Sequence, residues 1–226
     1  MATLERLREV RERLVAAGTV VAADGASRAL FPVAIGPIEG WALTDWVRRE
    51  GALRTVETGL GFAMSTLFIC EGLLANGVGG RHVATDPYQF TGHSTHRTTY
   101  LSVGLQILEE AGVRDFVEFY PEESQITLPR LLAEGREFDL SFLDGNHRFE
   151  GVFLDLVYSG RLLKEQGVVF VDDTQLPSVA RAVNYCVTNL GWADEDDGAE
   201  ETHEWRVLRT GPREALMRPF DQFVDF

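Results

Sequence analysis

The sequence predicts an α/β fold built on a mostly parallel sheet. The first observation is Arg54–Gly77, which has the pattern of a short strand, a glycine-rich turn and a helix. The second is Phe138–Thr174, where strand, helix and strand follow one another as in a right-handed parallel crossover. The third is length, because 226 residues suffice for one α/β domain with a full core and are too few for two. We therefore expect one domain over residues 1–226.

The N-terminal region precedes the core of this domain. Residues 1–18 carry leucine and valine at helical spacing among charges and lack a continuous apolar run, so they predict an amphipathic helix and not a signal peptide. Residues 19–36 mix glycine, alanine and proline, and we expect a connector or part of a lid. The core is expected over 37–226, where a turn beginning at Pro37 leads into a helix from about Trp41.

Composition excludes several classes of function. The formal charge of −14, from 35 acidic and 21 basic side chains, argues against nucleic acid, whose phosphates require clusters of Lys and Arg. No apolar run approaches the length of a transmembrane span, so we expect no membrane partner and a cytoplasmic location. Cys70 and Cys186 fall in unrelated helical segments without metal-binding spacing, which predicts buried free thiols in a reducing compartment.

The glycine-rich turn after the first strand has the features of a ligand-binding loop. Gly59 and Gly61 alternate with larger residues, so backbone N–H groups can approach a ligand without interference from β-carbons. Ser65 is expected to cap the following helix, and Gly77 suits the position after its end. A dinucleotide fingerprint needs glycine where Met64 stands, so an NAD-dependent dehydrogenase is only a distant alternative.

The next two strands end near polar side chains. Arg81–Asp86 is a short apolar strand, and its terminal acid is placed to accept hydrogen bonds from ribose hydroxyls. An aspartate that merely starts the Asp-Pro turn is the alternative. Val117–Tyr120 predicts a third strand, and Ser124 just beyond it is a candidate for contact with adenine.

Three segments lie outside this framework. The polar stretch 88–100 contains His93 and His96, whose spacing is weak evidence for a metal site, and a mobile loop is the preferred interpretation. The acidic run 194–201 is interpreted as a solvated hairpin loop. The apolar residues of 218–226 are expected to dock on the body or on a second subunit, so a homo-oligomer remains an open alternative.

Three carboxylates are predicted to meet at one edge of the sheet. The strand Phe138–Leu143 ends in Asp144, and the strand Val168–Val171 ends in Asp172 and Asp173. Because the crossover brings the carboxyl ends of both strands to the same edge, these acids converge where open α/β sheets bind ligands. Oxygen ligands favour a hard divalent ion such as Mg²⁺, with Ca²⁺ or Mn²⁺ as alternatives. The alternative is that Asp144 or Asp173 merely caps backbone N–H groups and that Asp172 points to solvent.

His147, three residues after Asp144, is the candidate general base. Its unperturbed pKa near neutrality suits removal of a proton from a substrate hydroxyl. A divalent ion can hold a pair of substrate hydroxyls and lower their pKa, which generates an oxygen nucleophile. A turn histidine satisfied by the backbone is the alternative.

Taken together, these segments resemble a known family. VETGLGFAMST, ATDPYQ, FDLSFLDGNHRFEGVFLDL and RLLKEQGVVFVDDTQLPSV are similar, in order and spacing, to bacterial class I S-adenosylmethionine-dependent methyltransferases with a D-G-x-H motif, including metal-dependent sugar O-methyltransferases of macrolide biosynthesis. The resemblance runs from about Pro37 to Val187. It implies a Rossmann-like fold with a seven-stranded sheet, a C-terminal antiparallel hairpin and helices on both faces. Glu204–Arg209, which alternates as a late strand would, fits that hairpin.

The resemblance also implies roles for individual residues. Catalysis would depend on His147 and Asp144. The metal ligands would be Asp144, Asp172 and Asp173. Asp172 stands where the macrolide enzymes place a glutamate, Thr174 would replace the asparagine of catechol-type enzymes, and Ala63 replaces the last loop glycine. The residues expected to bind the cofactor are Glu57, Thr58, Gly59, Gly61, Ser65, Asp86, Ser124 and Asp144.

The predicted function is therefore S-adenosylmethionine-dependent O-methyl transfer to a small hydroxylated acceptor, such as a sugar or another natural product, with help from Mg²⁺ or another divalent cation. A hydroxylase-type reaction and a non-catalytic protein that binds S-adenosylmethionine on the same scaffold are the alternatives. The sequence leaves the acceptor, the methylated position, the metal and the oligomeric state open.

Overall fold

The structure is a computed structural model that describes all residues except 1, 23, 91–99, 196–203 and 214–218. It contains two compact units, Met1–Glu123 and Ser124–Phe226, and each is described by itself. The expectation of one domain over the whole chain stays a prediction. Within the described ranges, no helix is both long and apolar enough to cross a bilayer. The stretch with His93 and His96 and most of the acidic run 194–201 lie outside the described residues.

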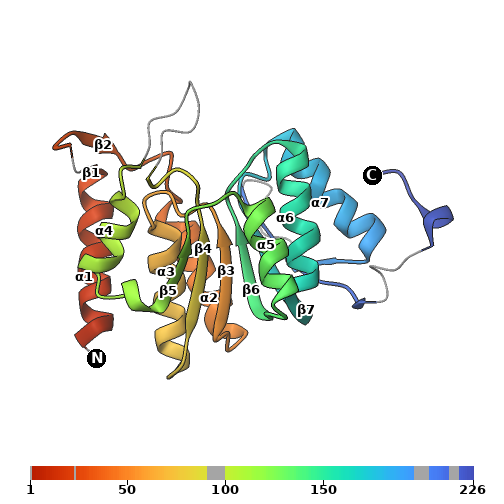
Figure 1. Cartoon of the computed structure of the whole chain (residues 1–226), viewed down its shortest axis with the longest axis horizontal. Helices are drawn as coiled ribbons and strands as arrows, with labels where there is room; N and C mark the ends of the chain where they lie inside the picture. The colour runs from red at the N-terminus through yellow and green to blue at the C-terminus, as the bar shows by residue number, and fades with distance from the viewer. Residues whose placement is uncertain (1, 23, 91–99, 196–203, 214–218) are drawn as a thin grey trace. The chain divides into compact units, whose positions relative to one another are not determined.

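The first unit contains a parallel sheet, a separate hairpin and helices packed against one another (Figure 1). The parallel strands lie in the order β5-β4-β3, and Thr55 is the register partner of His82. The elements are α1 (Ala2–Ala17), β1 (Thr19–Val21), β2 (Ser27–Ala29), α2 (Pro37–Arg49), β3 (Arg54–Thr58), α3 (Met64–Asn76), β4 (Arg81–Thr85), α4 (Val103–Glu110), the 3₁₀ turn η1 (Arg114–Phe116) and β5 (Val117–Tyr120).

Helix α1 is amphipathic, as the sequence predicted. Its buried face contains Leu7, Val10 and Leu14, and the same face also buries Arg11, which is 2 % exposed. The guanidinium of Arg11 forms an ion pair with Glu71 on α3 and lies 4.3 and 4.5 Å from the ring centroids of Trp41 and Phe68. A buried guanidinium needs such partners, because an unpaired charge in the core is costly. Arg11 therefore ties α1 to α2 and α3.

Two details of the N-terminal region differ from the sequence prediction. The expected connector 19–36 contains the antiparallel hairpin β1-β2, whose three-residue strands are too short to leave a clear pattern. Pro37, predicted to begin a turn, is the first residue of α2, where its missing N–H costs nothing. Gly40 lies inside that helix. An added β-carbon at this position would come within 2.2 Å of the Phe68 ring, so only glycine fits. The glycine thus allows α2 to pack closely on α3.

The second unit contains the remaining strands and three helices that lie side by side (Figure 1). The strands lie in the order β6-β7-β9-β8, with β6 and β7 parallel and the others antiparallel. Helix α6 passes directly into β7, so this strand begins five residues before the predicted Val168. The elements are α5 (Ser124–Ala133), β6 (Phe138–Leu143), α6 (Phe149–Leu162), β7 (Leu163–Val171), α7 (Pro177–Leu190), β8 (Ala193–Asp194), β9 (Arg206–Arg209) and the 3₁₀ turn η3 (Phe220–Gln222).

The last described residues dock on α7, which is one of the two alternatives that the sequence left open, and a second subunit stays a prediction. The side-chain amide of Asn189 donates to the carbonyl of Val224 at 2.8 Å and accepts from the N–H of Val224 at 2.9 Å. The ring of Phe226 packs edge-on against Tyr185, with centroids 5.1 Å apart, and the Arg181 guanidinium lies 4.7 Å from the Phe226 ring. The double hydrogen bond of Asn189 satisfies the backbone of Val224 as a neighbouring strand would.

The predicted fold class is confirmed. The two units together supply seven strands of a mostly parallel sheet, with the β8-β9 hairpin at the C-terminal end. The strands predicted as Val117–Tyr120 and Phe138–Leu143 have the predicted bounds. Cys70 on α3 and Cys186 on α7 are buried and free, as expected, and burial raises the pKa of each thiol.

Candidate active site

The glycine-rich turn follows β3 in the first unit and has the expected backbone. Gly59, Gly61 and Ala63 adopt φ values of +93°, +50° and +62°. These left-handed conformations alternate along the loop, which is where glycine is favoured. The hydroxyl of Thr58, at the end of β3, is buried and has no hydrogen-bond partner among the described residues. A buried polar atom without a partner is uncommon, so this position fits a ligand-binding loop.

Ser65 does not cap α3, and that prediction is wrong. The helix begins at Met64 with Ala63 as its N-cap residue, and no side chain caps it. The left-handed turn at Ala63 brings the chain into the helix too early for Ser65 to be the cap. The Ser65 hydroxyl instead donates to Glu57 Oε2 at 2.9 Å, and the neighbouring Thr66 hydroxyl donates to Glu57 Oε1. Both hydroxyls therefore serve the acid at the end of β3.

Asp86 follows β4 and supports the glycine loop through a hydrogen bond. Its Oδ2 accepts a hydrogen bond from the N–H of Gly61 at 2.9 Å, and its Oδ1 accepts from the N–H of Tyr88 at 2.7 Å. Gln89 adds a third donor at 3.1 Å, and its amide also donates to the carbonyl of Gly61 at 2.8 Å. Burial raises the pKa of Asp86. Contact between Asp86 and a ribose stays a prediction, and the loop-supporting role is an addition to it.

In the second unit, two neighbouring strand ends carry the predicted acids. Leu143 and Val171, the last residues of β6 and β7, are register partners, and the N–H of Asp172 donates to the carbonyl of Leu143 at 3.0 Å. Asp144 and Asp172 therefore leave adjacent strands at the same edge of the sheet, as the crossover predicted.

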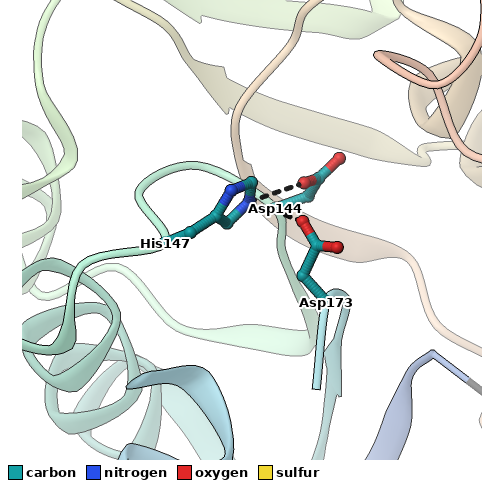
Figure 2. Close-up of side chains that lie close together, drawn as sticks. All are labelled: Asp144, His147 and Asp173. Atoms are coloured by element: carbon teal, nitrogen blue, oxygen red, sulfur yellow. Dashed lines mark hydrogen bonds and ion pairs between the residues drawn. The ribbon is translucent and has the colours of Figure 1, made fainter. Parts of the chain in front are cut away.

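His147 lies between two of these carboxylates (Figure 2). Its Nε2 is 3.3 Å from Asp144 Oδ1 and 3.0 Å from Asp173 Oδ2. The loop that carries His147 is held from α7, because the Ser178 hydroxyl donates to the carbonyl of His147 at 2.6 Å. Ser178 was not predicted from the sequence, where its only signal is its position one residue inside a helix.

Asp172 and Asp173 point to different partners. The N–H of Asp173 donates to Asp172 Oδ1 at 2.6 Å, and Gln175 donates to Asp173 Oδ1 at 2.8 Å. Asp173 has a left-handed φ of +57°, which is uncommon for a residue with a β-carbon and often marks a functional site. One ligand atom each from Asp144, His147 and Asp173 lie within 4.8 Å of one another, which suits a metal ion. Asp172 as a ligand stays a prediction.

The electrostatics of this cluster are dominated by burial and mutual charge. Burial of Asp144 is the main cause that raises its pKa to about 7. Contacts with Asp144 and then Asp173 raise the pKa of His147 to about 10, and His147 in turn lowers the pKa of Asp173. At neutral pH the imidazole is thus protonated, and its positive charge occupies the place of a cation between two acids.

The sequence-predicted site residues are thus distributed over both units. The first unit brings Glu57 together with Ser65, and Gly61 together with Asp86. The second unit brings His147 together with Asp144 and Asp173. Ser124 is the first residue of α5, and its contact with adenine stays a prediction.

Comparison with known proteins identifies the family. A model described as a methyltransferase domain matches residues 56–174, which is more than half of the chain and includes both the glycine loop and the Asp144–Asp173 segment. No curated protein matches the sequence.

Solved structures support the fold. The chain is similar to an O-methyltransferase from Bacillus cereus in complex with S-adenosylhomocysteine, with 16% identity, coverage of 94% of this chain and 91% of that one, and a TM-score of 0.63. It is also similar to the O-methyltransferase TomG from Streptomyces achromogenes, involved in tomaymycin synthesis and bound to S-adenosylmethionine, with 18% identity, coverage of 93% and 90%, and a TM-score of 0.64. At these identities the structures show a shared fold. The chain therefore belongs to the methyltransferase domain family, has the Rossmann-like class I fold, and is an S-adenosylmethionine-dependent methyltransferase.

Proposed function

We propose that the protein transfers a methyl group to a hydroxyl of a small molecule, with a sugar or another natural product carrying adjacent hydroxyls as the acceptor class and a divalent cation as an aid. The observation that carries this proposal is His147 held 3.3 and 3.0 Å from two carboxylate oxygens. A base of this type suits deprotonation of a hydroxyl. Because the chain belongs to the methyltransferase domain family, the electrophile would be the methyl group of S-adenosylmethionine.

The first unit provides the cofactor loop in this proposal. The turn Gly59–Gly61 leads to the start of α3, where a helix N-terminus favours an anionic group such as a carboxylate. The unpartnered hydroxyl of Thr58 lies at the same strand end. S-adenosylmethionine would supply a methyl group bonded to a positively charged sulfur. Ser124, in the second unit, remains the candidate for contact with the adenine.

The second unit provides the acid–base and cation-binding groups. Asp144, Asp173 and, by proposal, Asp172 would hold Mg²⁺, which prefers carboxylate oxygens. A bound cation would orient adjacent acceptor hydroxyls and lower their pKa. Asp144 and Asp173 hold His147 in place, and with their charges neutralised His147 would lose the cause of its raised pKa and become a neutral base.

Calorimetric titration with S-adenosylmethionine, with and without Mg²⁺, tests the first half of the proposal. Formation of S-adenosylhomocysteine with a panel of acceptors that carry adjacent hydroxyls tests the second. We expect saturable cofactor binding, turnover with at least one acceptor of the panel, loss of turnover in EDTA and recovery with Mg²⁺. Turnover that is indifferent to EDTA would remove the metal from the proposal.

A matched pair of variants assigns the chemistry to the cluster. Asp144→Asn changes a cluster acid that follows β6, whereas Asp139→Asn changes a more distant acid within β6, one whose carboxylate pairs with Lys164 at 3.2 Å. We expect only Asp144→Asn to abolish formation of S-adenosylhomocysteine. A hydroxylase-type protein or a non-catalytic cofactor-binding protein would form no S-adenosylhomocysteine with any acceptor.

A further inference from the structure

A second histidine–carboxylate contact lies in the first unit, between β4 and the strand that precedes the glycine loop. Thr55, Glu57 and His82 have no exposed surface at all. The side chains of Thr55 and Glu57 share one face of β3, because they are two residues apart, and the register places His82 of β4 beside Thr55. His82 Nδ1 lies 2.8 Å from the Thr55 hydroxyl, and His82 Nε2 lies 3.1 Å from Glu57 Oε1.

Two hydroxyl groups next to Glu57 donate hydrogen bonds to its carboxylate. Ser65 and Thr66 in the first turn of α3 donate to its two oxygens, so Glu57 acts as an acceptor through both. If the Thr55 hydroxyl donates to Nδ1, the neutral imidazole carries its proton on Nε2, which faces Glu57. The tautomer is assigned from this network. The contacts thus run from the middle of the sheet, through His82 and Glu57, to the first turn of α3.

One contact in this series is not fully formed. The Nε2 of His82 is within ion-pair distance of Glu57, yet it makes no aligned hydrogen bond with any residue that the structure describes. A buried N–H without an aligned acceptor calls for an explanation beyond packing. Polar contacts at ligand sites are often poorly aligned in the free protein and tighten in the complex.

We propose that His82 is a positioning residue for S-adenosylmethionine binding, which acts through Glu57 to fix the first turn of α3 and the glycine loop before it. This inference rests on the proposed function of that loop. His82 itself is fully buried and is not expected to touch the cofactor. Its effect therefore appears in cofactor affinity and in no chemical step.

The test is calorimetric titration of the full chain with S-adenosylmethionine, at a temperature where every variant is folded by circular dichroism. His82→Leu removes both polar contacts while keeping an apolar side chain in the core. We expect its dissociation constant to rise on the order of tenfold or more, as when hydrogen-bond partners that orient a binding group are removed. His82→Gln keeps a donor and an acceptor on one side chain and should restore most of the affinity.

Val83→Ala is the matched control for core destabilisation. Val83 is the next residue of β4, 1 % exposed, and its side chain points to the opposite face of the sheet. We expect it to lower the melting temperature without changing the cofactor affinity. An unchanged affinity in His82→Leu, or a loss that His82→Gln does not repair, would overturn the positioning role. Absence of binding by the parent chain would instead overturn the proposed function together with this inference.

Discussion

The residues that the structure describes include two histidine–carboxylate groupings that share their chemistry and differ in their surroundings. In the first unit, Glu57 and His82 are fully buried, and hydroxyls on α3 complete the shell of the carboxylate. In the second unit, His147 and Asp173 keep 35 % and 27 % of their side-chain surface exposed, and the imidazole lies between two acids. Burial with extra donors suits a structural or positioning role. Two carboxylates around one imidazole leave excess negative charge, and the partial exposure leaves room for other molecules. This arrangement suits a site that receives a cation and a substrate.

The largest difference between the groupings should appear in turnover. His147→Ala removes the proposed base, and we expect the rate to fall about a thousandfold, within the range found when a general base is lost. The dissociation constant for S-adenosylmethionine should stay within a few fold, because His147 lies outside the cofactor loop. Formation of S-adenosylhomocysteine and calorimetric titration measure the two effects. Near-parental turnover in this variant would contradict the base assignment.

The groupings should also differ in their contribution to stability. Glu57→Ala leaves His82, Ser65 and Thr66 without their shared acceptor in the core, and we expect the free energy of unfolding to fall by about 3 kcal/mol. Asp173→Ala removes a partly exposed acid, and a loss of at most about 1 kcal/mol is expected. Urea denaturation of both variants measures the difference. Equal losses would mean that exposure does not separate the two groupings.

The exposed grouping should make stability depend on pH in metal-free protein. The pKa of His147 is raised from 6.5 to about 10 in the folded chain, so its stabilising contribution is complete below pH 6.5 and is lost as the pH rises through 10. The pKa of Asp144 is raised from 3.8 to about 7, so the preference of the fold for its protonated form is lost as the pH rises from 3.8 through 7. Both effects lower stability toward alkaline pH.

Thermal melts in EDTA at pH 6.5 and pH 9.5 test this sign. We expect the parent chain to lose more of its melting temperature between these values than His147→Asn, which has no proton to release. A parent chain that melts at a higher temperature at pH 9.5 would show that the sign is wrong. The low pKa of Asp173 adds a loss of stability only in acid, below its ordinary value of 3.8.

The smallest expected effect concerns the two thiols, one in each unit. Burial raises the pKa of Cys186 to about 12 and raises that of Cys70 further above its ordinary value. Because the thiolate is the reactive form, neither should react with a thiol reagent at pH 8 in the folded protein. Both should react after denaturation. Rapid labelling of one thiol in the native chain would indicate local opening of the helix that carries it, and so would rank the two units by stability.

The sequence predicted the strand ends better than the contacts between them. In 117–120 and 138–143 apolar residues stand at every second position, and Pro121 and Asp144 follow them directly, so their ends were clear. The short strands of the β1-β2 hairpin were missed, because three residues carry no periodicity. The left-handed turn at Ala63 was also missed, and with it the start of α3, since alanine gives no signal for a positive φ.

The same limit applies to the site. The acids after β6 and β7 were predicted to converge from topology alone, and Asp144, His147 and Asp173 do lie together. The turning of Asp172 toward the N–H of Asp173 depends on the φ of Asp173, which the sequence does not reveal. His82 looked like an ordinary strand residue. The one clue was the presence of three polar residues, Thr55, Glu57 and His82, in two short strands, and it became meaningful only with the register known.

The double hydrogen bond between Asn189 and Val224 has a practical consequence for handling the protein. Phe226 is packed on Tyr185 of the same helix as Asn189. A dye or linker attached at Val224 or Phe226 would therefore disturb contacts with α7. The turn at Val78, fully exposed between two glycines of the first unit, makes no such contact with any described residue and is the better place for a dye or an immobilisation handle.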